Sequence, residues 1–125
     1  MPVYAEVVLN PTEQDQKDLQ LIYGEMPAIS EVAHLVGARF NGRLVGALKL
    51  VAQGDSHQIV DLNVREVTRR RGVARQVLLN LTRNLPEGVN ALSVDLSANP
   101  ELEPLFASLS FSFEGGLEAG LWQKA

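Results

Sequence analysis

A chain of 125 residues, 46% hydrophobic and 21% charged, has the composition of one soluble globular domain, which we expect residues 1–125 to form. With no cysteine and only two histidines, the chain excludes disulfides and thiolate chemistry, and no metal site is expected. The net charge of -4 argues against nucleic-acid binding, and the absence of a membrane-length apolar run predicts a cytoplasmic protein that binds no membrane.

The amino-terminal residues predict a strand followed by a helix. Residues 3–9 alternate in polarity, as a strand does, and Thr12 is the expected N-cap of the helix. Asp15 follows at the position where a carboxylate favours the positive end of a helix dipole. The helix has one apolar face, formed by Leu19, Ile22 and Tyr23.

Three strands are predicted next, as a meander. Asn41 and Gly42 separate the apolar runs 34–40 and 43–53, and both residue types accept the positive φ of a tight turn. These runs should therefore form an antiparallel hairpin. The third strand of the meander is predicted over residues 58–64.

The second half of the chain predicts a helix and shorter elements. An apolar stripe with 3.6-residue spacing predicts a helix that begins at residues 71–73 and ends before Pro86. A strand over 91–97, a short helix over 99–109 and a terminal strand pair within 111–124 should follow. The resulting order β-α-β-β-β-α-β-α-β-β predicts an α/β fold, α+β in some schemes, with helices flanking a mixed sheet.

An arginine-rich loop precedes the second helix. Gly72 lies at the helix amino end, where unpaired backbone N–H groups and the helix dipole favour an anion, and it lets the backbone approach closely. Four arginines surround it: Arg69, Arg70, Arg71 and Arg75. A solvated helix start is the alternative, but basic side chains repel the positive dipole end unless an anion is present. We therefore expect a phosphate or pyrophosphate at this loop.

The spacing Arg69-x-x-Gly72-x-Ala74 after a strand resembles the pyrophosphate loop of the GNAT superfamily of N-acetyltransferases, and the predicted element order matches that fold. The resemblance implies that acetyl-CoA or CoA is the cofactor. It implies that the pantetheine arm faces Leu62, Asn63 and Val64. It also implies that the pyrophosphate meets a run of loop and helix residues: Thr68, Arg69, Arg70, Arg71, Gly72, Val73, Ala74 and Arg75.

Three segments, "DQKDLQLIY", "ARFNGRLVGA" and "LNVREVTRRRGV", resemble a narrower family, the maturation factors of aspartate 1-decarboxylase called PanM or PanZ. The resemblance extends to about residue 85, and Ala74 replaces a glycine common in the family. It implies an acetyl-CoA-dependent regulator that binds the decarboxylase, precursor and mature, promotes cleavage of the precursor to the pyruvoyl form, and links β-alanine supply to CoA level. The resemblance also implies that the isolated chain is a monomer and that it forms a hetero-oligomer with the decarboxylase.

The same resemblance places Arg39 and Asn41 near the edge that faces the partner. Asn41 is equally well explained by the turn it occupies, so a hairpin role and a partner role both stay open.

The alternative function is N-acetylation of a small amine or a protein. In the resembled superfamily a tyrosine usually protonates the departing thiolate, and the corresponding position here is Phe106, which has no proton to give. We therefore predict no catalytic residue, and a non-enzymatic role is preferred. A structural domain whose arginines are merely solvated is the third possibility.

Overall fold

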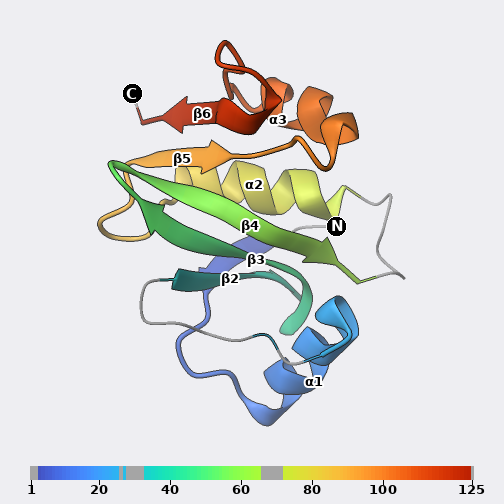
Figure 1. Ribbon diagram of the computed structural model, residues 1–125. Helices are drawn as coiled ribbons and strands as arrows, with labels where there is room; N and C mark the ends of the chain where they lie inside the picture. The colour runs from blue at the N-terminus through green and yellow to red at the C-terminus, as the bar shows by residue number, and fades with distance from the viewer. Residues whose placement is uncertain (1–2, 26, 28–32, 66–71, 125) are drawn as a thin grey trace.

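The computed structural model describes residues 3–25, 27, 33–65 and 72–124. Within these residues, six strands form one mixed sheet in the order β1-β2-β3-β4-β5-β6 (Figure 1). The elements in chain order are β1 (Tyr4–Val7), α1 (Glu13–Tyr23), β2 (Ala33–Phe40), β3 (Arg43–Gln53), β4 (Ser56–Val64), α2 (Val73–Arg83), β5 (Ala91–Val94), the 3-10 turn η2 (Pro100–Leu102), α3 (Glu103–Ser108), the 3-10 turn η3 (Leu117–Ala119) and β6 (Gly120–Gln123).

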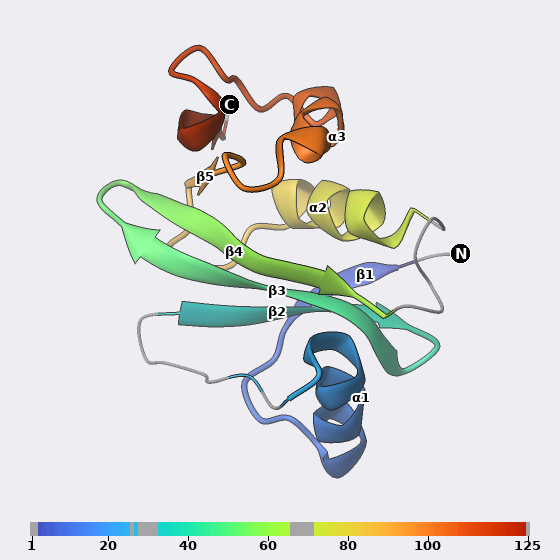
Figure 2. The ribbon, with the colours of Figure 1, turned by 45° about the vertical axis from the view of Figure 1, so that its right-hand side comes forward.

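The sheet separates two hydrophobic clusters. The smaller lies under α1, where Leu19 and Ile22 meet strand residues such as Leu44. The larger lies under α2 and α3, on the other face of the sheet, and includes Val77 and Phe106 (Figure 2). Each helix thus presents one apolar stripe to one face of the sheet, as the predicted α/β class requires.

The start of α1 confirms the predicted N-cap. The Thr12 hydroxyl accepts a hydrogen bond of 3.1 Å from the Asp15 N–H, and the Asp15 carboxylate accepts one of 3.2 Å from the Thr12 N–H. This reciprocal capping box satisfies two N–H groups that a helix start otherwise leaves unpaired. Gly24 ends the helix in a left-handed conformation.

The hairpin predicted around Asn41 and Gly42 is also confirmed. Both residues have positive φ, 49° and 78°, and Phe40 pairs with Arg43 across the turn. The hairpin joins β2 to β3 beside α1 (Figure 2). Turn chemistry therefore sets the register next to the turn, and an irregularity between Ala38 and Arg39 shifts it farther along the strands.

A β-bulge interrupts β4 and was not predicted. Ala47 pairs with Asn63 while Lys49 pairs with Val60, so β4 has one residue more than β3 between these pairs. Asp61 lies in the bulge with φ 52°, in the left-handed region that non-glycine residues seldom adopt. The bulge reverses the alternation of side chains along the rest of β4.

The parallel pairing of β4 with β5 is limited to two residue pairs, His57 with Leu92 and Gln58 with Ser93. Beyond them the strands diverge, and β5 ends at Val94 rather than at residue 97 as predicted. The Asp95 carboxylate accepts hydrogen bonds from the N–H and the hydroxyl of Ser97, which turns the chain away from the sheet.

The predicted terminal strand pair is only partly formed. Of the residues 111–124, β6 is a strand, while the preceding segment contributes one isolated bridge, Ser112 with Leu121. The Phe111 ring instead packs edge-on against Phe106, with centroids 5.0 Å apart, which draws the chain toward α3. Core packing here overrides the alternating pattern.

Candidate functional site

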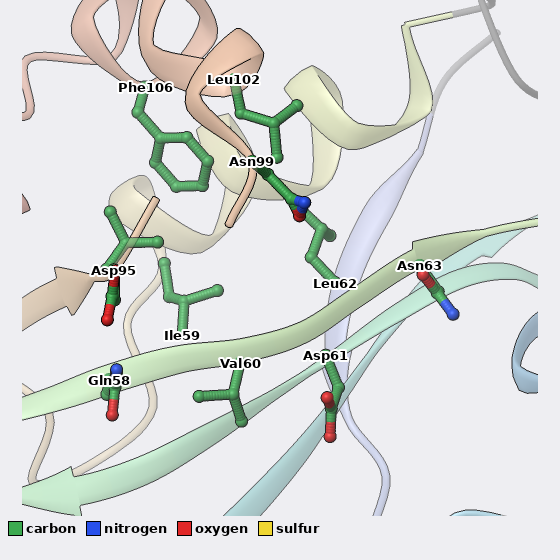
Figure 3. Close-up of a pocket in the computed structure, with 11 residues that line it drawn as sticks. Gln58, Ile59, Val60, Asp61, Leu62, Asn63, Asp95, Asn99, Leu102 and Phe106 are labelled. Carbon is green, nitrogen blue, oxygen red and sulfur yellow. The ribbon is translucent and has the colours of Figure 1, made fainter. Parts of the chain in front are cut away.

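The divergence of β4 from β5 opens a pocket of about 360 Å³. Its walls come from β4, from the end of β5 and from η2 and α3: Gln58, Ile59, Val60, Asp61, Leu62, Asn63, Val94, Asp95, Asn99, Leu102 and Phe106 (Figure 3). Beyond Gln58, β4 has no partner strand on its β5 side in the described part of the chain. Backbone groups along that edge are available to a ligand in the pocket.

The two sides of β4 give the pocket two different walls. Ile59 and Leu62 point toward the side of α3, where Phe106 and Leu102 complete an apolar surface (Figure 3). Val60, Asp61 and Asn63 point to the opposite side, and Val60 and Asp61 do so consecutively because of the bulge. An extended ligand lying along β4 would thus have an apolar surface on one side and polar groups on the other.

Contacts from α1 and β3 hold the bulge at Asp61. The Tyr23 hydroxyl donates a 2.8 Å hydrogen bond to the Asp61 carbonyl oxygen, and Lys49 Nζ lies 3.2 Å from the Asp61 carboxylate. Burial, and then the negative charge of Asp61, raise the pKa of Tyr23 well above its usual value. The phenol therefore remains a hydrogen-bond donor throughout the neutral pH range.

The amino end of α2 lies beside the end of β4. An added Cβ on Gly46 would come within 3.1 Å of the Asn63 carbonyl oxygen and 3.4 Å of Val73 Cγ1, so these residues are close neighbours. Gly72, the N-cap, has φ 75° and makes no side-chain cap, and among the described residues an added Cβ there would meet Gln76 Nε2 alone, at 4.0 Å. Gly72 itself is exposed, as is Arg75 in the first turn of α2.

The residues predicted to meet the pyrophosphate differ in how exposed they are. Val73 is buried in the core, so only its backbone could meet a ligand, while Gly72 and Arg75 are exposed and Ala74 is partly buried. The other four predicted residues, Thr68, Arg69, Arg70 and Arg71, lie outside the described residues.

The predicted partner residues lie on the β2–β3 hairpin. Asn41 is exposed at its tip. The Arg39 side chain is held inside the molecule's own ion-pair network, 2.9 Å from Glu6 and 2.8 Å from Asp15. Hydrogen bonding from Arg39 holds the pKa of Asp15 below its usual value, although burial of the carboxyl opposes this. Arg39 thus has a structural role whatever it contacts in a complex.

The ionisable side chains among the described pocket-lining residues are those of Asp61 and Asp95. Phe106 lines it with 1% of its surface exposed, and the lining residues of the described chain include no tyrosine, histidine, cysteine or lysine. His34 and His57 lie together elsewhere on the sheet, with ring centroids 6.0 Å apart. Among the described residues, no three histidine or acidic side chains gather as a metal site would require. The part of the chain that the structure describes also has no helix of the length and apolarity that a membrane span needs.

The fold is that of a GNAT domain. The structure resembles the Escherichia coli protein YhhK, solved bound to coenzyme A, with a TM-score of 0.69 and 27% identity over 100% of both chains. It also resembles a GNAT acetyltransferase from Elizabethkingia anophelis solved with acetyl-CoA, with a TM-score of 0.63 and 15% identity, covering 96% of this chain and 94% of that one.

Residues 2–114 match the model of the PanZ acetyltransferase (GNAT) domain, and the chain belongs to the PanZ family. Two curated relatives are named PanD regulatory factor. The Salmonella typhimurium protein is 39% identical over 77 residues, which are 58% of this chain and 61% of that protein. The Escherichia coli protein is 38% identical over 79 residues, 60% of this chain and 62% of that protein. The aligned segment thus spans about three fifths of these relatives.

Sequence reasoning missed several residues that shape the pocket. Leu102 of η2 and Asn99, the residue before η2, line the pocket. Tyr23 and Lys49 do not line it but contact Asp61, which does. Nothing in local periodicity signals any of them, because each acts across a tertiary contact. The one available signal was Asp61 itself, a charged residue between apolar neighbours in a strand, where a bulge or a paired charge is needed.

Proposed function

We propose that this protein is a cytoplasmic, acetyl-CoA- or CoA-dependent regulator that binds the precursor of aspartate 1-decarboxylase and promotes its self-cleavage to the pyruvoyl form. The observation that carries the proposal is the pocket between the diverging strands β4 and β5, in a chain of the PanZ family. The name of the curated relatives, PanD regulatory factor, supports a regulatory role. The isolated protein would be a monomer, and with the decarboxylase it would form a hetero-oligomer.

The residues present fit coenzyme A. The free edge of β4 at Leu62, Asn63 and Val64 can pair with the amides of a pantetheine arm, and the apolar wall near Phe106 can receive its thiol end. Gly72, an exposed N-cap without a side chain, would let a pyrophosphate approach the backbone N–H groups of α2, with Arg75 in the first turn of that helix. When bound, the cofactor would supply a thioester or thiol. The fraction of the protein that carries the cofactor would report the level of CoA to the decarboxylase.

Regulation requires that the cofactor bind the complex better than the free protein. The decarboxylase must then raise the affinity for the cofactor by the same factor. We propose that Asn41, at the exposed hairpin tip, contacts the partner. Arg39 would either contact the partner through the part of its side chain that stays exposed or hold the hairpin in position through its ion pairs.

The test is a cleavage assay. Purified protein, acetyl-CoA and decarboxylase precursor are mixed, and the cleaved chains are followed over time. We expect cleavage to accelerate only when protein and acetyl-CoA are both present. An unchanged rate would overturn the proposal.

Amine acetylation is the alternative, and the composition of the described pocket wall does not favour it. A panel of amines incubated with the protein and acetyl-CoA should release no thiol above the hydrolysis background. Amine-dependent release would favour acetyltransferase activity instead.

A further inference from the structure

We propose that Tyr23 is a positioning residue for the cofactor: its hydroxyl holds the bulge at Asp61 in the conformation that lets β4 present its free edge to the pantetheine arm. This inference rests on the proposed binding of coenzyme A. Tyr23 belongs to α1 and is not among the described residues that line the pocket, so it acts through its hydrogen bond to the backbone of β4.

The bulge decides which side chains face which wall. In an uninterrupted strand, alternation would turn Asp61 toward the side of Ile59 and would turn Leu62 away from it. With the bulge, Leu62 joins Ile59 on the apolar side, and Asp61 faces α1 (Figure 3). A β4 without the bulge would place a carboxylate in the apolar wall near Phe106, where burial of a charge is unfavourable.

The conformation of the bulge needs support. A positive φ at a non-glycine residue is unfavourable in isolation and persists when surrounding contacts impose it. Two contacts do so at Asp61: the Tyr23 hydroxyl on its carbonyl oxygen, at 2.8 Å, and Lys49 Nζ on its carboxylate, at 3.2 Å. Lys49 Nζ also lies 6.0 Å from the centre of the Tyr23 ring, so the three side chains form one cluster.

The Tyr23 contact acts on the backbone of β4 just before the residues predicted to meet pantetheine. Its carbonyl acceptor belongs to Asp61, and Leu62, Asn63 and Val64 follow at once. The pyrophosphate end of the cofactor is expected at Gly72 instead, on α2. Loss of the hydroxyl should therefore weaken binding of the pantetheine part and spare the nucleotide part.

The experiment compares the parent with Tyr23→Phe, using two ligands in calorimetric titrations. One is acetyl-CoA, and the other is 3′-phosphoadenosine 5′-diphosphate, which keeps the pyrophosphate and lacks the pantetheine arm. The ring of Tyr23 packs with the α1 cluster, and phenylalanine preserves it. We expect acetyl-CoA to bind about fivefold more weakly to the variant, and the nucleotide to bind both proteins within about twofold.

The matched control is Tyr4→Phe, the same chemical change at a residue of β1 that is 62% exposed. It should change neither affinity. A backbone measurement accompanies the titrations: amide NMR signals of Asp61 to Val64 should shift in ligand-free Tyr23→Phe and stay in place in Tyr4→Phe.

The outcomes are separable. A parent that binds neither ligand defeats the proposed function and this inference with it. A parent that binds both, with a variant that loses neither or loses both equally, overturns the role of Tyr23 alone. Selective loss of acetyl-CoA affinity, together with shifted bulge amides, supports it.

Discussion

Asp18 of α1 and Arg43 of β3 are joined by three side-chain hydrogen bonds of 2.6 to 3.1 Å. The Asp18 side chain has no exposed surface and also accepts a 3.1 Å bond from the Leu44 N–H. A second ion pair, from Asp15 to Arg39, lies one turn earlier on the same helix. Together they fasten α1 to both strands of the hairpin that carries Asn41, so the helix fixes the position of the proposed partner surface.

Asp18→Asn should destabilise the protein. The amide can still accept a bond from the Leu44 N–H, but it cannot neutralise Arg43 at the edge of the buried site. We expect the free energy of unfolding at pH 7 to fall by about 2 kcal/mol, measured by urea denaturation. Glu13→Gln is the control, because Glu13 is exposed and its ion pair with Lys17 is 3.9 Å long. A variant as stable as the parent would contradict a supporting role for this ion pair.

The two aspartates also predict how stability depends on pH. Burial raises the pKa of Asp18, but bonds from Arg43, Leu44 and Gln14 outweigh burial and lower it below its usual 3.8, and the pKa of Asp15 is lowered as well. The unfolded chain therefore binds these protons at higher pH than the folded chain does. Their contribution is complete above the unfolded pKa and is lost as the pH falls through the folded values.

Unfolding measured from pH 7 down to pH 2 should thus show a loss of stability that starts below about pH 5. In Asp18→Asn the loss should be shallower, so that the difference from the parent narrows in acid. Parallel curves for the two proteins would contradict this account.

Gly72→Glu should abolish binding of acetyl-CoA. The new side chain would enter the space in front of the α2 amino end and bring a negative charge to the proposed pyrophosphate site. The control is Gly88→Glu, which makes the same substitution away from the amino end of α2. Gly88 has a similar positive φ, 84° against 75° for Gly72, so the backbone strain is matched, and an added Cβ would meet no described atom within 4 Å. Calorimetry should find no saturable binding for the first variant and normal binding for the second. Retained binding in Gly72→Glu would place the anion elsewhere.

Asn41→Gly separates the two interpretations of the hairpin tip. Glycine accepts the φ of 49° without a side chain, so the turn and the fold should persist, as would acetyl-CoA binding. If Asn41 contacts the decarboxylase, the variant should accelerate precursor cleavage about tenfold less than the parent at a limiting concentration. Full acceleration would assign Asn41 to the turn alone.

Asn80→Ala should weaken the docking of β1. The Asn80 side-chain oxygen accepts a 2.8 Å bond from the Ala5 N–H, and that of Gln76 accepts a 3.0 Å bond from the Val3 N–H. These α2 side chains thus accept hydrogen bonds from backbone N–H groups on the outer edge of β1, whose other edge pairs with β2. We expect a net loss of about 1 kcal/mol in urea denaturation, since the helix propensity of alanine offsets part of the lost bond. Asn90→Ala, in an exposed loop, should have no effect.

The sequence predicts best what neighbouring residues determine. The capping box at Thr12 and the turn at Asn41 each depend on a few consecutive side chains and backbone angles, and both were predicted correctly. The apolar stripe of α2 predicts its start and its buried face for the same reason. The fold followed because the order of such elements leaves few arrangements.

Features that depend on distant residues were missed. The bulge at Asp61 is contacted by Tyr23 and Lys49, which lie far from it in the sequence, and local alternation predicts a plain strand. The chain after Phe111 alternates like a strand, but the ring of Phe106 holds it elsewhere. Of the residues that line the pocket, the resemblance named Leu62, Asn63 and Phe106, whereas Asn99 and Leu102 were found only in the structure.

The two residue pairs that join β4 to β5 are a narrow seam in the sheet. On one side of it, strands β1 to β4 with α1 carry the free β4 edge and the hairpin, and on the other side β5, α3 and β6 carry the remaining wall of the pocket. Substitutions in the last thirty or so residues can therefore reshape one wall while the other keeps its geometry. If the pocket binds coenzyme A as proposed, such substitutions would change its selectivity for the group carried on the thiol and leave the hairpin surface unaltered.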